Sequence, residues 1–211
     1  MTQDVKRKYD ATSRREKAER TRATVLAEAR RQFLEHGYAA TSIPSIAAAT
    51  GFSVETIYKA YGPKSALVRA LWDQGLAGRG SVPAAERSDA AGAGRGDAGA
   101  LVAAWAALVG EVSPIASPLA LLVRQAAAHD VEMADLLEQI DRERRARMRT
   151  NAKRLLTHDG VRPDLTLAAA TDILWLYSSA EMYELLVIRS RMSLKRYTAF
   201  VEDAFRRQLL A

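Results

Sequence analysis

The sequence has no cysteine and only three histidines in 211 residues. Disulfide bonds, cysteine nucleophiles and thiolate metal sites are therefore excluded. His36, His129 and His158 do not form the H-x-x-x-H spacing of many zinc sites, so we predict neither a metal site nor a cofactor. The sequence also lacks an obvious nucleophile–base pair and a glycine-rich phosphate loop, which argues against an enzyme.

Long apolar runs are scarce as well. The N-terminus is polar and charged, without the apolar segment of a signal peptide. Polar residues interrupt the apolar runs well before the length of a membrane-spanning helix. We therefore expect a cytoplasmic protein with no membrane partner.

Strand-like alternation is missing too, and apolar residues instead recur at spacings of three and four. This pattern predicts an all-α fold of about nine helices. Gly37 and Gly51 are expected to end the first two helices, while Pro114 and Pro118 are expected to separate two later ones. Seven predicted helices cover residues 13–37, 41–50, 53–61, 101–112, 130–160, 163–188 and 193–209. Two more are predicted to begin at Pro63, running through Leu67, Leu71 and Trp72, and at Pro114 or Pro118, carrying Leu119, Leu122 and Val123.

Composition divides the chain into segments. Residues 1–13 predict a flexible basic tail, residues 14–62 a first helical domain, and residues 63–211 a second one. Within the second, residues 78–100 are rich in Gly and Ala and predict a mobile loop. Residues 1–75 contain 13 basic and 8 acidic residues, whereas the rest contains 18 and 17. The first domain is therefore the part expected to meet a polyanion, although the basic tail contributes to this excess.

Two short helices joined by a glycine-containing turn form a helix-turn-helix pattern at residues 41–61. Ile46, Ala47, Phe52 and Ile57 are expected to form its small core. The opposite face of the second helix is then free to enter a major groove about 12 Å wide. Lysine and hydroxyl side chains in "TGFSVETIYKAYGPK" suit this role; they are Ser53, Thr56, Tyr58, Lys59 and Lys64.

The stretches "AEARRQFLEHGYAATSI", "IAAATGFS", "ETIYKAYGPK" and "ALVRALW" follow one another between about Arg20 and Trp72. In this order they resemble the TetR-type transcriptional regulators, and the C-terminal half is similar to an actinobacterial-type branch. The resemblance implies a homodimer with an N-terminal DNA-binding domain. It also implies a C-terminal ligand-binding and dimerisation domain. Members are mostly repressors that a small molecule releases from a palindromic operator in double-stranded DNA.

The resemblance also implies roles for single residues. Thr41 stands where the family caps the second helix and contacts phosphate. Tyr58 and Lys64 stand at phosphate-contacting positions, while Lys59 could reach a phosphate or a guanine. The base-reading positions hold Val54, Glu55 and Thr56. The sequence departs from the pattern at Glu55, where many members have Gly, and at Ala60, where many have an aromatic residue or His.

Glu55 has two interpretations. An acid in the first turn of a helix is stabilised by the macrodipole, by about 0.3–1 kcal/mol. Alternatively, its carboxylate accepts a hydrogen bond from a cytosine amino group, worth about 1–3 kcal/mol of discrimination.

The second domain offers candidates for a ligand site. Glu181 lies in an otherwise apolar helix and could be exposed, paired or a polar anchor for a ligand, because a buried carboxylate needs a partner. Aromatic and polar residues that could line a cavity, or belong simply to the core, are Trp105, His129, Trp175, Tyr177, Met182 and Tyr183. The basic run "DRERRARMRTNAKR" is expected to be the exposed side of a long helix.

The last helix carries an apolar stripe that could form the dimer interface. Otherwise the stripe would pack only on its own domain; it comprises Leu194, Tyr197, Val201, Phe205 and Leu209. The sequence thus predicts a dimeric, ligand-responsive repressor. An activator that needs its ligand and a non-specific DNA-binding protein remain alternatives.

Overall fold

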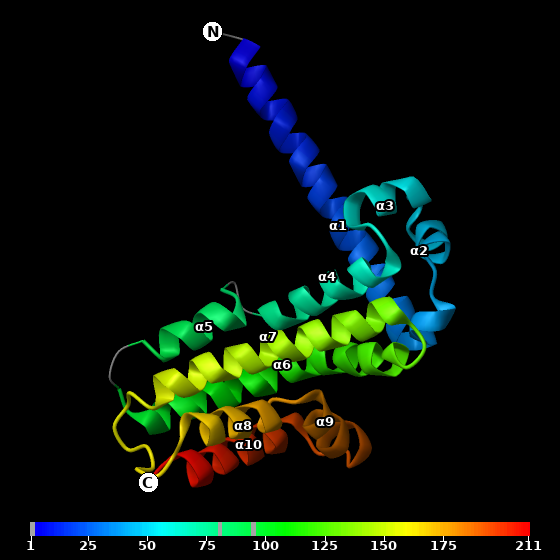
Figure 1. Ribbon diagram of the computed structural model, residues 1–211. Helices are drawn as coiled ribbons and strands as arrows, with labels where there is room; N and C mark the ends of the chain where they lie inside the picture. Colours follow the sequence, from blue (N-terminus) through cyan, green and yellow to red (C-terminus); the bar gives the residue numbers. More distant parts are fainter. Residues whose placement is uncertain (1–2, 80–81, 94–95) are drawn as a thin grey trace. The chain divides into compact units, whose positions relative to one another are not determined.

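The computed structural model describes residues 3–79, 82–93 and 96–211. Within these ranges the protein forms ten α-helices and a short π-helix, as Figure 1 shows. The fold is all-α, as predicted, and β-pairing in the described residues is limited to two isolated bridges. Two compact units are present; the first ends at Leu71 and the second begins at Trp72.

The first unit contains α1 (Gln3–Ala40), α2 (Ile43–Thr50), α3 (Val54–Tyr61) and the start of α4 (Lys64–Ala77). The backbone of α1 leaves helical geometry at Gly37, where φ is 81°. This agrees with the predicted stop. The unit is held by apolar side chains that are almost completely buried: Val25, Ala29, Phe33, Ile43, Ile46, Ile57, Leu67, Val68 and Leu71.

Local signals fix the short helices α2 and α3. Ser42 caps α2 through a reciprocal capping box with Ser45. Gly51 ends α2 with φ 73°, a left-handed conformation that favours glycine. Ser53 caps α3 by accepting a hydrogen bond from the backbone N–H of Thr56 at 3.1 Å. These bonds set the turn that orients α3.

A polar link joins α1 to α2. Gln32 is buried, and its side-chain carbonyl accepts a hydrogen bond from the Ser45 hydroxyl at 2.6 Å. The Gln32 amide donates to Glu28 at 2.8 Å. Hydrogen bonds from Arg31 and Gln32 lower the pKa of Glu28 to about 2. Glu28 therefore stays ionised and holds Gln32 in place against α2.

The helix α1 begins earlier than the sequence predicted. It extends back to Gln3, over residues that we expected to form a flexible tail. Residues 3–36 contain neither glycine nor proline, so nothing in the backbone chemistry interrupts the helix before Gly37.

The second unit contains the rest of α4, six further α-helices, which Figure 1 labels, and a π-helix that follows α9. They are α5 (Ala84–Ala91), α6 (Ala98–Ala127), α7 (Val131–Leu155), α8 (Leu167–Tyr177), α9 (Ala180–Tyr183), η1 (Glu184–Arg189) and α10 (Leu194–Leu209). Helices α6 and α7 form an antiparallel pair; α10 packs on α6, and α8 packs on α7. Their shared core includes Val102, Trp105, Leu155, Leu174, Tyr197, Val201, Phe205 and Leu209.

Helix α6 runs without interruption through Pro114 and Pro118, where we predicted a break. Each proline removes one backbone N–H bond, but α6 is the central helix of its unit and buries residues along its length. Tertiary packing therefore outweighs the local cost. Among the described residues, α6 is also the one helix long and apolar enough to cross a membrane, and 44% of its most apolar window is buried inside the unit.

Two further predictions were wrong in detail. The segment predicted as a mobile loop contains α5, which is capped by neither Ser nor Asp but packs against α6. The single helix predicted over residues 163–188 is broken at Ser178 and Ser179. The Ser178 hydroxyl donates to the Leu174 carbonyl at 2.8 Å, and Ser179 caps α9, so side chains replace the helical backbone bonds there.

Candidate DNA-binding face and ligand cavity

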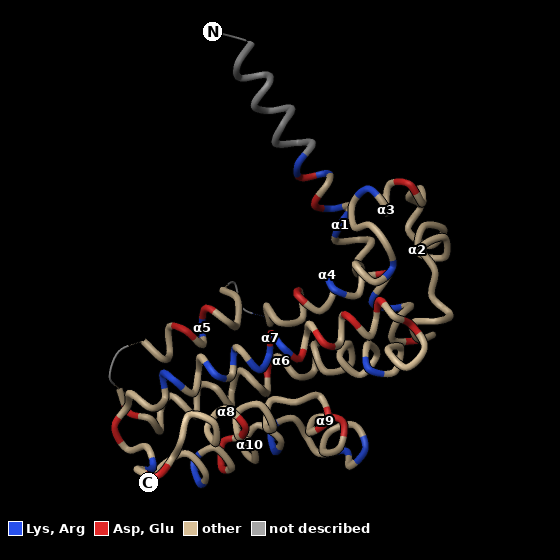
Figure 2. The backbone as a smooth tube through the Cα atoms, viewed as in Figure 1, with Lys and Arg blue, Asp and Glu red and all other residues tan. Residues whose placement is uncertain are grey.

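One face of α3 is exposed and polar, and the other is anchored in the core. Ile57 is completely buried, whereas Tyr58 is 52% exposed and Val54 is 38% exposed. Glu55, Thr56 and Lys59 are also exposed. In Figure 2 an acidic and a basic residue mark this short helix. The structure thus brings most of the predicted DNA-contacting side chains onto one surface.

The start of α3 is rigid because its hydroxyls bond to each other. The Ser53 and Thr56 hydroxyl oxygens lie 2.8 Å apart, and Ser53 also caps the helix. Glu55 lies in the first turn, where its charge complements the free N–H groups of the helix end. Both interpretations of Glu55 are compatible with this position.

Lys64 and Thr41 occupy structural positions that the sequence did not reveal. The Lys64 ammonium donates to the carbonyl oxygens of Tyr38 and Thr41 at 2.9 and 3.1 Å. Thr41 is 1% exposed, and its hydroxyl donates to the Gly37 carbonyl at 2.9 Å. The predicted capping role of Thr41 was wrong, because Ser42 caps α2. Its phosphate contact stays a prediction, for a side chain with almost no exposed surface.

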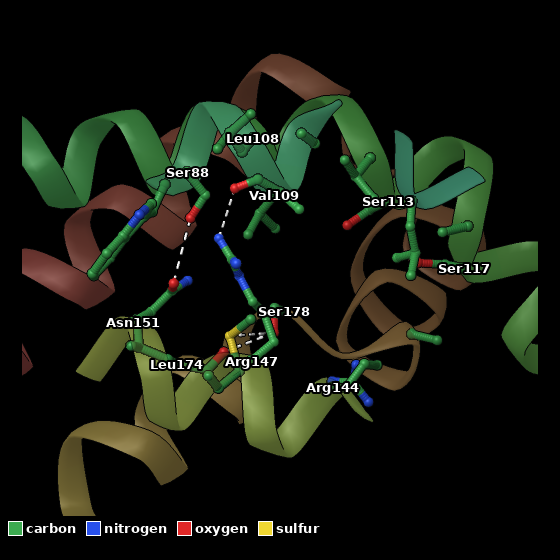
Figure 3. A pocket seen from close by; sticks show the side chains of 18 of the residues that line it. Ser88, Leu108, Val109, Ser113, Ser117, Arg144, Arg147, Asn151, Leu174 and Ser178 are labelled. Carbon is green, nitrogen blue, oxygen red and sulfur yellow. Dashed lines mark hydrogen bonds between the residues drawn. The ribbon is translucent and has the colours of Figure 1, made fainter. Parts of the chain in front are cut away.

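A cavity of about 330 Å³ lies inside the second unit. Most of its wall is apolar, with Trp72 and Leu76 from α4, Leu108 and Val109 from α6, and Leu174 from α8. Figure 3 shows α6 residues facing residues of α7 across this space. The polar lining residues are Ser88, Ser113, Ser117, Glu143, Arg144, Arg147, Asn151 and Ser178. Such a cavity suits a small, mainly apolar molecule.

Polar contacts hold α5 over one side of the cavity. Arg147 donates to the Ala85 carbonyl at 2.8 Å and pairs with Asp89 at 2.7 Å; Arg154 also pairs with Asp89. Hydrogen bonds from Arg154 and Arg147 lower the pKa of Asp89. Arg87 pairs with Glu111 of α6 at 2.6 Å. Since α5 contributes only Ala84 and Ser88 as buried side chains, ion pairs hold this helix more than apolar packing does.

Of the predicted ligand-pocket residues, Trp105 alone lines the cavity. His129 is exposed, and Glu181 is an exposed partner of Arg124 at 2.5 Å rather than a buried anchor. Tyr177 accepts a hydrogen bond from Gln208 at 2.7 Å and packs on Phe205. Trp175, Met182 and Tyr183 are not in the cavity wall, and Arg144 and Arg145 lie over the Trp175 ring.

The prediction that the basic run of α7 is exposed was wrong for the residues that line the cavity. Arg144, Arg147, Met148 and Asn151 recur at helical spacing and line the cavity. Arg144 and Arg147 belong to the basic run that we predicted to be exposed, yet their side chains are 15% and 27% exposed. The sequence contains one sign of this position: at helical spacing, Arg144 and Arg147 share a face of α7 with Met148 and the uncharged Asn151.

The predicted dimer stripe was mostly wrong. Four of its members are buried in the core of their own unit: Tyr197, Val201, Phe205 and Leu209. Leu194 is 38% exposed. The helix buries this stripe against α6 and α8, so it is not available to a second chain.

A different apolar surface is exposed on the second unit, and we call it the outer face. Its residues come from α8, η1 and α10, and α10 contacts each of the other two. They are Leu176, Leu185, Ile188, Leu194 and Phe200, each between 38% and 52% exposed. Single exposed apolar residues are ordinary, but five on contacting elements are typical of an interaction surface.

Comparison with known proteins agrees with this architecture. Residues 25–71 match the family described as "Bacterial regulatory proteins, tetR family". The solved complex of SmeT with triclosan is 20% identical, with a TM-score of 0.70; the match covers 90% of this chain and 92% of SmeT. No curated protein matches the chain.

Two other solved structures are similar over nearly their full length. NalD, the secondary repressor of the MexAB-OprM multidrug efflux pump in Pseudomonas aeruginosa, is 18% identical with a TM-score of 0.70, covering 92% of this chain and 98% of NalD. A regulator from Saccharomonospora viridis in complex with choline is 16% identical with a TM-score of 0.67, covering 92% and 99%. These likenesses show a shared fold. The family match covers residues 25–71, which contain α2, α3 and most of the first unit, and makes this part of the chain similar to the tetR family of bacterial regulatory proteins.

Proposed function

We propose that this protein is a sequence-specific repressor that binds an operator through α3 and leaves it when a ligand enters the cavity. The observation that carries the proposal is the exposed polar face of α3 on a buried Ile57 anchor, within the residues that match the family. A short helix presented in this way fits the major groove of double-stranded DNA.

In this proposal, Val54, Glu55 and Thr56 contact base edges from the N-terminal half of α3, and Tyr58 and Lys59 contact phosphates. All five side chains are exposed. Ser53 positions the helix end and keeps its hydroxyl at the surface. Affinity then depends mainly on phosphate contacts and falls steeply with salt, whereas the α3 start supplies sequence preference.

The route from ligand to DNA is proposed to run along α4. This helix begins at Lys64, which is bonded to Tyr38 and Thr41 of the first unit, and carries Trp72 and Leu76 into the cavity wall. A ligand that binds one arrangement of α4 more tightly than another changes the affinity for DNA by the same factor. Small-molecule complexes of two structural neighbours, with triclosan and with choline, support a ligand role for this fold.

We further propose that the protein is a cytoplasmic homodimer joined through the outer face. Isologous pairing of this surface would cover its five exposed apolar residues and present two α3 helices related by a two-fold axis. Such a dimer suits an inverted repeat whose half-sites are about 34–36 Å apart.

The deciding experiment is selection of genomic fragments by the purified protein at physiological salt, followed by sequencing. Recovery of an inverted repeat is expected, and the genes beside it will indicate the regulated process. A reporter behind that operator should be silenced by the protein. Recovery of random fragments only, both without and with candidate ligands, would contradict specific binding. Recovery of the inverted repeat only in the presence of a ligand would indicate an activator.

A further inference from the structure

The polar groups of the cavity are mostly hydrogen-bond donors. Among the described residues, the indole N–H groups of Trp72 and Trp105 are buried and have no hydrogen-bond partner. Asn151 is 5% exposed and accepts from Ser88 at 3.4 Å through its oxygen. Buried donors are ordinarily paired, but these two indole nitrogens have almost no accessible surface, so the groups that set the ligand preference are the charged lining residues.

The carboxylate in the wall does not balance these donors. Glu143 is an exposed residue at the rim, and it accepts a hydrogen bond from Gln139 at 2.9 Å. Asp89, which pairs with Arg147, is not part of the wall. The charged lining residues are therefore two arginines and one acid, a net positive charge that disfavours a cationic ligand.

Arg144 is the arginine whose charge is least compensated. Its guanidinium donates to the Trp175 carbonyl at 3.1 Å and to Asp141 at 3.5 Å, a long contact to a half-exposed carboxylate. Arg147, in contrast, has a short ion pair with Asp89 and a short bond to the Ala85 carbonyl. Burial lowers the pKa of Arg144, and the carboxylates of Asp141 and Glu181 offset this only in part.

We propose that the cavity selects an apolar ring molecule that carries one anionic group, and that this group pairs with Arg144. The proposal rests on the proposed function only for its biological role, because the binding itself needs no DNA. The apolar walls hold the ring system, and Arg144 supplies the preference for a carboxylate or a similar anion. In Figure 3, Arg144 lies along α7 on the same cavity wall as Arg147 and Asn151.

Three probes of matched shape test the proposal: naphthalene-2-carboxylate, naphthalene-2-carboxamide and naphthalen-2-ylmethylammonium. Their binding to the full chain is measured by titration calorimetry at neutral pH. We expect the carboxylate to bind about tenfold more tightly than the amide, as an ion-paired acceptor should, and the ammonium most weakly. Equal or tighter binding of the ammonium, or saturable binding of none of the three, would overturn the proposal.

Substitutions on α7 locate the effect. Arg144→Gln should remove the preference for carboxylate over amide, and Arg144→Lys should keep part of it. The matched control is Arg145→Gln, since Arg145 is the next residue, pairs with Asp172 at 2.7 Å and is outside the cavity wall. Circular dichroism and thermal melts confirm that each variant is folded. A preference that survives Arg144→Gln, or that Arg145→Gln removes, would contradict the assignment.

The two proposals fail in different ways. A protein that binds the carboxylate but recovers no inverted repeat has the proposed cavity chemistry without the proposed repressor function. A protein that recovers an operator but prefers the ammonium is a DNA-binding regulator with a different ligand class.

Discussion

The Lys64 ammonium lies 3.9 Å from the centre of the Tyr38 ring and donates to the Tyr38 carbonyl at 2.9 Å. The start of α4 is thereby fixed to the end of α1. The family resemblance predicts that Lys64 contacts a DNA phosphate. In this protein, Lys64 is also part of the internal structure of the first unit.

Lys64→Met should therefore lower both stability and DNA affinity. Loss of charge-assisted bonds to two carbonyls is expected to cost about 1.5–3 kcal/mol of unfolding free energy, measured by urea denaturation. Lys59→Met is the control, because Lys59 is exposed on α3 and should lower DNA affinity and its salt dependence while leaving the urea midpoint unchanged. An unchanged urea midpoint for Lys64→Met would disprove the structural role.

Glu55→Ala tests whether the acid reads a base. Its exposed place in the first turn of α3 makes the expected loss of stability small, at most about 1 kcal/mol. The expected change in sequence preference is about 1–3 kcal/mol at one base pair of each half-site, measured with single-base operator variants. If the order of affinities for the variant operators is the same in both proteins, Glu55 only stabilises the start of α3.

Gly110→Ala should destabilise the second unit. A Cβ atom at this position would overlap the Thr198 side chain, because α6 and α10 approach closely there. The expected cost is about 1–3 kcal/mol, read from thermal unfolding. Gly96→Ala is the control, since a Cβ at Gly96 meets nothing within 4 Å. Adding Thr198→Ala to Gly110→Ala should restore part of the stability, and no recovery would argue against this contact.

Ile188→Glu should separate the proposed dimer into single chains. Ile188 is 49% exposed on the outer face, so a charge there costs little in the single chain but is buried on pairing. Sedimentation at micromolar concentration should show a monomer. Val131→Glu is the matched control, because Val131 is 78% exposed at the start of α7 and outside the outer face. A dimer that persists in Ile188→Glu would exclude this surface as the interface.

Asp89→Asn should loosen α5. The folded pKa of Asp89 is lowered by Arg154 and Arg147, so its carboxylate stabilises the docked helix above the usual carboxyl pKa. This contribution is lost as the pH falls through the folded pKa. Hydrogen exchange of α5 amides should therefore be faster in Asp89→Asn at neutral pH, and faster in the parent protein at high salt. Glu86→Gln on the exposed side of α5 should change neither rate.

The helix-turn-helix could be predicted closely because its signals are local. Ser53, Gly51 and the spacing of Ile46 and Ile57 act within a few residues, so the caps and the buried face follow from the sequence. Thr41 is the exception, because its burial depends on the chain reversal near Gly37 rather than on its neighbours in the sequence.

The cavity could not be predicted in the same way. Its walls come from seven helices, α4 to α10, and residue type did not distinguish Trp105 in the wall from Trp175 outside it. The α10 stripe was correctly seen as apolar, but periodicity alone does not say whether a stripe faces its own core or another chain. The position of Arg144 was mispredicted because a run of basic residues usually indicates a solvent-exposed face. In this protein the Arg144 side chain is largely buried.

The many small residues of the cavity wall have a consequence for evolution. Ala85, Ala116, Ala120, Ser113 and Ser117 leave space that a single enlarging substitution would fill, reshaping the volume without a new fold. Among the described residues, the core cluster of the second unit contains none from the first unit. In the proposed repressor, ligand preference can therefore diversify by small substitutions in the second unit, while the operator bound by the first unit stays the same.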